Sequence, residues 1–231
     1  MRRDFIANVS HELKTPITSI KGSVETLLQE EEMDGSTLNR FLKIIARHSD
    51  RLNSIIEDLL TLSRIEQGQM TVVEHLQVTS INQLIQQVLQ VCEHSASEKG
   101  IKLEMNDDEI LDAAVNPPLL EQALINLVEN AIKYSDPKSL VTLSLEKQAD
   151  KFIICVRDQG FGIEAKHHER IFERFYRIDV ARSRKLGGTG LGLSIVKHII
   201  QAHQGTVSVT STPGEGSTFL IQIPFIEMNH T

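Results

Sequence analysis

The chain has 231 residues, 40% of them apolar, which is enough for one large domain or two small ones. Its 24 Lys and Arg against 31 Asp and Glu give a formal net charge of −7, which disfavours a general nucleic-acid or anionic-membrane binder. Cys92 and Cys155 lack metal-type spacing and predict buried free thiols in a reducing compartment, and no run approaches the ~18 apolar residues of a membrane span.

Two long helices are predicted in the first 66 residues. Residues 3–30 carry apolar side chains at helical spacing, and the breakers Asp34 and Gly35 follow. From Leu38 to Leu62 the apolar positions alternate steps of three and four, a heptad repeat with one polar residue, His48. A period of 3.5 is typical of helical bundles, and one hairpin cannot cover its own stripes. We therefore expect two chains to pair as a four-helix bundle.

From about residue 67 onward, the pattern changes to alternating strands and helices. Strands are predicted at 71–78, 101–105, 139–147, 151–158, 206–212 and 217–225, and helices at about 80–99, 118–134 and 190–205, with a polar stretch at 164–187. Strand hairpins beside helices predict an α+β fold, here an α/β sandwich of one mixed sheet with one helical layer.

The predicted helix NLVENAIKYS (126–135) carries a polar face. Asn126, Asn130 and Lys133 are four and three residues apart, so their side chains share one side of the helix. Asparagine is a mediocre helix former, and two on one face of a buried-looking helix need partners. The face is either a solvated outer surface or an amide and ammonium array for Mg²⁺ and polyphosphate oxygens.

Two glycine motifs extend this nucleotide hypothesis. In DQGFG (158–162), which follows an apolar strand, Asp158 could accept the exocyclic amine of adenine while Gly160 and Gly162 let the base approach. GGTGLGL (187–193) opens a helix and offers free N–H groups and a positive dipole end to phosphate. It is neither a Walker loop nor in the βαβ context of a dinucleotide fingerprint. Together, the motifs predict a nucleotide site.

In their order, the motifs resemble the cytoplasmic catalytic core of bacterial sensor histidine kinases, the transmitters of two-component signalling. SHELKTP (10–16) resembles the phosphoacceptor box and FERFYR (172–177) the F box. The three motifs above match the N box and both glycine boxes, so the resemblance covers nearly the whole chain. FIANVSHELKTPITSIKG and FERFYR further resemble the branch with the phosphate-starvation and cell-wall sensor kinases.

The family implies a division of the chain into two domains. Residues 1–66 would be a dimerisation and histidine phosphotransfer hairpin, and residues 67–75 a linker. Residues 76–231 would be a Bergerat-type ATP-binding domain, with a mobile lid at about 164–189. The abrupt start of the chain suggests a fragment, and the resemblance implies that it is the cytoplasmic portion of a membrane-anchored sensor.

His11 is the candidate phosphoacceptor. It is two residues from Val9 and Leu13, about 200° around the helix, so it faces away from the apolar stripe. An exposed imidazole is largely neutral at cytoplasmic pH and hence nucleophilic. The resemblance implies that its Nε2 attacks the γ-phosphorus of ATP. Glu12 is either an ordinary solvated carboxylate or the group that bonds Nδ1 of His11 and takes up the developing positive charge.

Two residues after this pair carry further expectations. By resemblance, Thr15 positions water to dephosphorylate the partner protein, although it could merely support the helix. Pro16 cannot donate a hydrogen bond to the carbonyl of Glu12, so we expect a bend there, either a hinge or a tolerated kink.

The resemblance also assigns roles in the second domain to residues that match the family's motifs. They are Asp158, Gly160 and Gly162 for adenine; Asn130 and Asn126 for Mg²⁺; Lys133 and Tyr134 for phosphate or ribose; Gly188, Gly190, Leu191 and Gly192 for the phosphate end of the lid; and Arg174 for phosphate. The implied partners are a second copy of the chain and an aspartate of a response regulator receiver domain. Asn116 departs from the aspartate that relatives commonly carry before the N-box helix, and we attach no loss of function to it.

Two other functions are weighed against the kinase. ATP hydrolases of the same superfamily place a glutamate four residues before the Mg²⁺-binding asparagine, where this chain has Asn126. An amide cannot take a proton from water, and Glu129 is about 100° from Asn130, off the shared face. The other alternative, an ATP-sensing dimerisation module, requires that His11 is never phosphorylated.

Overall fold

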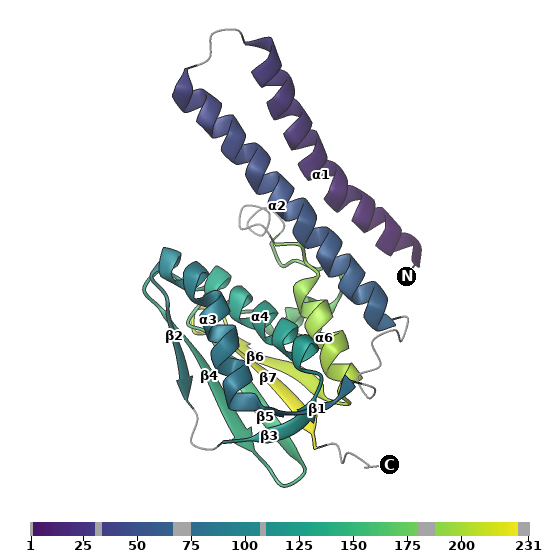
Figure 1. The fold of residues 1–231 in the computed structure, drawn as a ribbon, viewed down its shortest axis with the longest axis vertical. Helices are drawn as coiled ribbons and strands as arrows, with labels where there is room; N and C mark the ends of the chain where they lie inside the picture. Colours follow the sequence, from purple (N-terminus) through teal and green to yellow (C-terminus); the bar gives the residue numbers. More distant parts are fainter. Residues whose placement is uncertain (1, 31–33, 67–74, 107–109, 180–187, 226–231) are drawn as a thin grey trace.

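The computed structural model describes residues 2–30, 34–66, 75–106, 110–179 and 188–225 (Figure 1). A helical hairpin extends away from a sheet covered by helices, which we call the α+β part. Of the predicted linker, residues 67–74 lie outside the described residues, as do residues 180–187 of the predicted lid.

The hairpin consists of α1 (Arg2–Gln29) and α2 (Gly35–Glu66), as predicted. Asp34 caps α2: its Oδ1 accepts hydrogen bonds from the backbone N–H groups of Ser36 and Thr37, at 2.9 and 3.0 Å. These bonds and those from the two hydroxyls hold the pKa of the Asp34 carboxyl far below its usual value. α1 remains one helix across Pro16, which is buried, so the predicted bend stays a prediction.

Apolar side chains remain uncovered along the hairpin. Those exposed by more than a third are Ile17, Val24, Leu28, Leu38, Leu42, Ile56 and Leu60. Their number on two otherwise amphipathic helices is consistent with the predicted pairing of two hairpins in a bundle.

The α+β part contains a five-stranded sheet in the order β2-β4-β5-β7-β6. Its strands are β2 (Lys102–Asn106), β4 (Leu140–Lys147), β5 (Lys151–Arg157), β6 (Thr206–Thr212) and β7 (Gly216–Pro224). Only β2 and β4 run parallel, so the sheet is mixed, as predicted. α3 (Ile81–Lys99), α4 (Pro117–Tyr134) and α6 (Gly192–Ala202) cover one face (Figure 1). The mixed sheet with one helical layer is therefore confirmed.

A second, two-stranded sheet departs from the prediction. β1 (Gln77–Ser80) pairs antiparallel with β3 (Asp112–Val115). The strand predicted at 71–78 therefore begins later, and β3 was not predicted. The polar stretch after β5 forms two short turns, η2 (Ala165–His167) and η3 (Arg170–Phe172).

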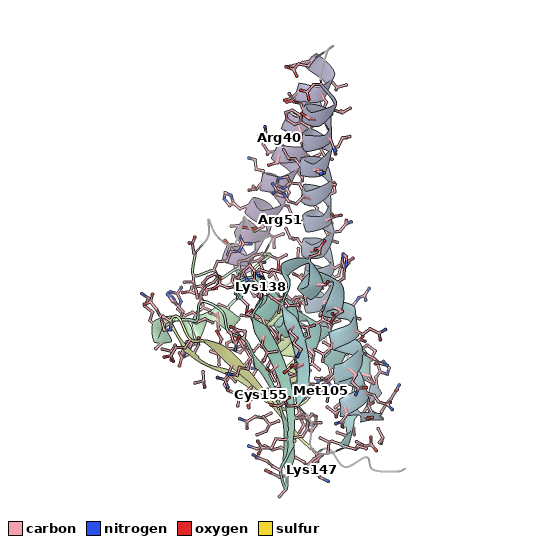
Figure 2. All side chains as sticks on the ribbon, turned by 90° about the vertical axis from the view of Figure 1, so that its left-hand side faces the viewer. Arg40, Arg51, Met105, Lys138, Lys147 and Cys155 are labelled. Carbon is pink, nitrogen blue, oxygen red and sulfur yellow. The ribbon has the colours of Figure 1, made fainter. Side chains whose placement is uncertain are left out.

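The two parts of the chain share one hydrophobic core. Leu62 near the end of α2 is 2% exposed and belongs to the cluster that includes Ile195 and Ile199 of α6. Leu59 and Ile65 pack against the same cluster. The lower end of the hairpin is thus fixed against α6. Figure 2 shows Arg51 on the half of the hairpin nearer the α+β part, and Arg40 farther away.

α4 is anchored at both ends. At its start, the Asn116 side chain accepts from the N–H of Leu119 at 3.3 Å, so this asparagine caps the helix. The Asn116 N–H donates to Nε2 of buried His203 at 3.0 Å. At the other end, Nζ of Lys99 donates to the carbonyls of Ile132 and Lys133, both at 2.8 Å.

Candidate nucleotide site

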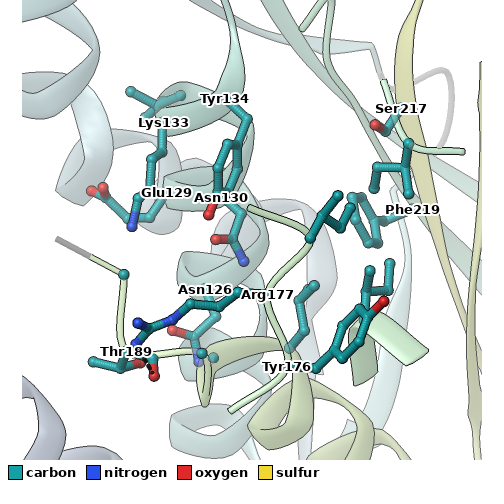
Figure 3. A pocket seen from close by; sticks show the side chains of 18 of the residues that line it. Asn126, Glu129, Asn130, Lys133, Tyr134, Tyr176, Arg177, Thr189, Ser217 and Phe219 are labelled. Atoms are coloured by element: carbon teal, nitrogen blue, oxygen red, sulfur yellow. Dashed lines mark hydrogen bonds between the residues drawn. The ribbon is translucent and has the colours of Figure 1, made fainter. Parts of the chain in front are cut away.

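A cavity of about 650 Å³ lies between α4, the start of α6, the segments that follow β5 and η3, and α2 of the hairpin. One face of α4 lines it with Gln122, Asn126, Glu129, Asn130, Lys133 and Tyr134 (Figure 3). The predicted common face of Asn126, Asn130 and Lys133 is therefore present. The exclusion of Glu129 from that face was wrong. Asn126, three residues before it, and Lys133, four residues after it, lie on the same side of the helix as Glu129, and all three line the cavity.

Asp158 lies at one end of the cavity and is 4% exposed. Its Oδ1 accepts hydrogen bonds from the N–H groups of Gly160, at 2.8 Å, and Ser217, at 3.1 Å. Both backbone bonds use Oδ1, so Oδ2 is the oxygen that neither of these N–H groups occupies. Burial raises the pKa of the carboxyl, while the two backbone donors and a hydrogen bond from the Ser217 side chain lower it. Phe161, Ile163 and Phe219 add apolar surface, so this end suits a flat base with an amine.

The two glycines beside Asp158 have a structural role besides any contact with a base. A Cβ on Gly160 would collide with the carbonyl oxygen of Tyr134. One on Gly162, which has φ +67°, would collide with the carbonyl of Thr212. The sequence analysis attributed these glycines to the approach of adenine, whereas the collisions show that close backbone packing alone requires them.

The other end of the cavity is built for anions. Gly188, Thr189, Gly190 and Gly192 line it where α6 begins, so the positive end of that helix points there. Leu191 differs from the prediction: its side chain is fully buried in the core. Burial, with the nearby charges of Arg177 and Arg51, lowers the pKa of Lys133 to about 8.

The F-box arginine at the cavity is not the predicted one. Arg174 is absent from the lining, and its Nη2 lies 3.3 Å from Nε2 of His198. Arg177, three residues later, lines the cavity and donates to the Thr189 carbonyl at 2.6 Å (Figure 3). FERFYR offers two arginines in irregular structure, where no periodicity indicates which one faces inward.

The oxygen atoms in the cavity wall suit a hard cation such as Mg²⁺ that is bound together with phosphate. Among the described residues, no group of three or more His, Cys, Asp or Glu side chains could hold a metal. The amides of Asn126 and Asn130 and the Glu129 carboxylate offer oxygen ligands in the cavity wall. The Nδ2 of Asn126 is buried without a partner, so it can donate to a phosphate oxygen.

The described part of the predicted lid is anchored. Ile171 and Phe172 of η3 are buried, and the Phe172 ring meets Phe219 edge-on at 6.4 Å. Movement of this segment as a lid therefore remains a prediction.

The predicted phosphotransfer residues lie on α1. His11 is exposed, and the Thr15 hydroxyl donates to the His11 carbonyl at 3.2 Å, which places both residues on one face. The Glu12 carboxylate, predicted to bond the imidazole, instead accepts from Arg51 at 2.8 Å and from Arg177 at 2.9 Å. α2 contributes Ser54, Glu57, Asp58 and Thr61 to the cavity wall.

Two family models match the chain. Residues 1–68 match the His Kinase A (phospho-acceptor) domain, and residues 115–227 match the histidine kinase-, DNA gyrase B- and HSP90-like ATPase. The sensor-like histidine kinase SenX3 of Mycobacterium tuberculosis is 39% identical over 99% of this chain and 55% of its own length. The sensor protein kinase WalK of Staphylococcus saprophyticus is 35% identical over 96% of this chain and 36% of its own. The chain thus spans about half or less of the length of these relatives.

Solved structures of histidine kinases share the fold. The kinase ThkA in complex with the response regulator protein TrrA has a TM-score of 0.77 and 27% identity, over 96% of this chain and 61% of that one. Full-length ShkA in complex with AMPPNP has a TM-score of 0.72 and 26% identity, over 97% of this chain and 46% of that one. None of the described helices of the present chain is long and apolar enough to cross a membrane.

Proposed function

Because the chain belongs to the sensor histidine kinases, with a phospho-acceptor domain and an ATP-binding domain, we propose that it autophosphorylates His11 and passes the phosphoryl group to a response regulator. Nε2 of His11 attacks the γ-phosphorus of ATP, the bond to the β–γ bridging oxygen breaks, and ADP leaves. The phosphoryl group then moves to an aspartate of a receiver domain. The observation that supports this proposal is a nucleotide cavity walled by the same hairpin that presents an exposed histidine.

The residues of the cavity divide the work. Oδ2 of Asp158 accepts a hydrogen bond from the exocyclic amine of adenine, and the fixed backbone around Gly160 and Gly162 shapes the base pocket. Lys133 and Arg177 attract the polyphosphate, and the N–H groups at the start of α6 bind its oxygens.

The remaining assignments follow from the family and from position. Asn126 and Asn130 would hold Mg²⁺, which neutralises charge on the leaving phosphates. Thr15, on the face of His11, would position water for dephosphorylation of the regulator. We place the domain boundary in the linker at 67–75 and expect two copies of the chain to pair through the hairpins. The parent protein would be membrane-anchored, with this portion in the cytoplasm.

A transfer assay with γ-labelled ATP and Mg²⁺ tests the proposal. We expect a label on the protein that is labile in acid, stable in alkali and lost in His11→Gln. Thr18→Ala, a change about two turns farther along the same helix, removes a hydroxyl that bonds only the Lys14 carbonyl among the described contacts; it is the matched control and should keep the label. Phosphate release without labelled protein would refute the kinase.

The position of Glu129 in the cavity wall supports a second candidate, ATP hydrolysis, because a carboxylate there could activate water. The same assay separates the two functions. A hydrolase would release phosphate from ATP, and Glu129→Gln would abolish that release.

A further inference from the structure

The contact between the hairpin and the α+β part includes one carboxylate held by two arginines. Nη2 of Arg51 donates to Oε2 of Glu12 at 2.8 Å, and Arg177 donates to the two oxygens from Nη1 at 3.3 Å and Nη2 at 2.9 Å. We call these three residues the Glu12 clamp. Glu12 and Arg51 belong to the hairpin, whereas Arg177 follows η3, so the clamp joins the two parts of the chain.

The clamp is largely shielded from solvent, but two of its hydrogen-bond donors lack partners. The side chains of Glu12, Arg51 and Arg177 are 13%, 9% and 5% exposed. Two guanidinium groups face one carboxylate, and the Nε atoms of both arginines are buried without hydrogen-bond partners. Unpaired buried donors and an excess of positive charge are both costly, so an incoming anion would be attracted to this place.

The clamp also holds the loop that would bind phosphate, Gly188 to Gly190, which we call the glycine-rich loop. Arg177 donates to the Thr189 carbonyl at 2.6 Å, and Arg51 to that of Gly188 at 3.5 Å. The Thr189 hydroxyl donates to Oδ2 of Asp58 on α2 at 2.7 Å. Carboxylates of the hairpin therefore hold the glycine-rich loop in two ways. Asp58 bonds the Thr189 hydroxyl directly, and Glu12 holds the two arginines that bond the carbonyls of Gly188 and Thr189.

The charged groups of the cavity are unevenly distributed. The wall from α2 brings the carboxylates of Glu57 and Asp58, whereas the cations Lys133 and Arg177 lie in the rest of the lining. That part of the lining also holds the carboxylates of Glu129, Asp158 and Asp179. A polyphosphate entering the cavity would be attracted by the cations and repelled by the α2 carboxylates. The same ligand would thus pull Arg177 from Glu12 and push the α+β part away from α2.

We propose that the Glu12 clamp and the Asp58–Thr189 bond form a resting-state lock, which the polyphosphate of an incoming nucleotide opens. In the locked state, Glu12 is bound to two arginines, and no described hydrogen bond joins it to His11. Opening frees Glu12 for the imidazole and frees the glycine-rich loop for phosphate. The lock regulates the proposed kinase and so rests on that proposal.

Disulfide trapping tests the lock without measuring phosphorylation. Asp58→Cys with Thr189→Cys places two thiols at the docked contact, and the intrachain disulfide changes the mobility of the unreduced monomer on a gel. Cys92 can stay, because it is buried and burial raises its thiol pKa to about 12, whereas Cys155 is replaced by Ala. His11→Gln in the same chain excludes any effect of phosphorylation.

In this background, we expect rapid cross-linking that slows about tenfold in Arg177→Gln, because a charge-assisted bidentate contact is lost. Glu12→Gln breaks the clamp from the other side and should slow the reaction similarly. Arg174→Gln is the matched control, since that arginine contacts His198 within the α+β part, and it should cross-link at the parent rate.

The probes are ADP and inorganic tripolyphosphate, each at a concentration shown to saturate the cavity by displacement of a fluorescent nucleotide. Both should slow cross-linking about as much as Arg177→Gln does. Unchanged rates in both Arg177→Gln and Glu12→Gln would overturn the clamp. Unchanged rates with saturating ADP would overturn its opening by nucleotide. If cross-linking responds as expected but the wild-type chain never labels His11 in the transfer assay, the lock stands and the kinase is refuted.

Discussion

Replacement of Asp158 by asparagine tests the assignment of the adenine pocket. The two backbone donors, from Gly160 and Ser217, both use Oδ1, and an asparagine oxygen can accept from both. Its amide NH₂ then takes the place of Oδ2 and faces the adenine amine, donor against donor. The lost bond to a charged acceptor is worth about 1.5–3 kcal/mol, so we expect ADP affinity to fall roughly 10- to 150-fold.

The same geometry predicts a change in base preference. Hypoxanthine has a carbonyl oxygen where adenine has its amine, and the new amide can donate to that oxygen. Asp158→Asn should therefore lose much less affinity for IDP than for ADP. The free energy of unfolding should change by no more than about 1 kcal/mol, because a neutral amide avoids the cost of burying a charged carboxylate. That cost is the reason why burial raises the pKa of Asp158.

Isothermal titration calorimetry of ADP and IDP against both proteins measures these effects, and the midpoint of thermal unfolding monitors the fold. Equal losses for the two nucleotides would indicate a distorted pocket and would refute the assignment of Oδ2. Unaltered ADP affinity would show that adenine binds elsewhere. Gln159→Glu, a change at the next, exposed position, is the control and should alter neither affinity.

Three further outcomes follow from the structure. Thr15→Ala should spare autophosphorylation and weaken dephosphorylation of a receiver domain; equal loss of both rates would contradict a separate role. Burial raises the pKa of Asp58 from 3.8 to about 6, so the folded state binds more protons than the unfolded state between these values, and stability falls as pH rises through them. Relative to wild type, Asp58→Asn should gain thermal stability from pH 4 to 7, by at most about 3 kcal/mol; a constant difference would exclude this ionisation. Gly162→Ala should lower the unfolding midpoint, because φ +67° and the Thr212 carbonyl exclude a Cβ; a preserved midpoint would show that the backbone there adapts.

The helices and most strands could be predicted because their patterns are local. α3 begins at the capping Ser80 and ends before Gly100, which has φ +67°, and the sequence marks both residues. β3 was missed because DAAV is short, contains three residues of low strand propensity and runs almost directly into α4. Its pairing with β1 is a long-range contact that periodicity cannot report.

The site was predictable where residue type and helical spacing agree, as for Asn126, Asn130 and Lys133. Glu129 was wrongly excluded because it is about 100° from Asn130 around the helix. The cavity wall is broad enough to include two neighbouring residues of one turn, Glu129 and Asn130. Arg177 could not be chosen over Arg174, because tertiary packing of an irregular segment decides which side chain turns inward. The Glu12 clamp depends on how two parts of the chain meet, and no local pattern encodes that contact.

The anchoring of α4 has a thermodynamic consequence for nucleotide selection. Asn116 with His203 fixes one end of the helix and Lys99 the other, and Gly160, next to Asp158, packs against the carbonyl of Tyr134 at the end of α4. The α4 side chains that face the phosphates and the backbone beside the base pocket therefore have their spacing before a ligand arrives. A preorganised wall loses little conformational entropy on binding, whereas the glycine-rich loop must exchange its hairpin partners for phosphate. Differences among purines should therefore appear mainly in the dissociation rate, while the length of the phosphate chain should change the association rate.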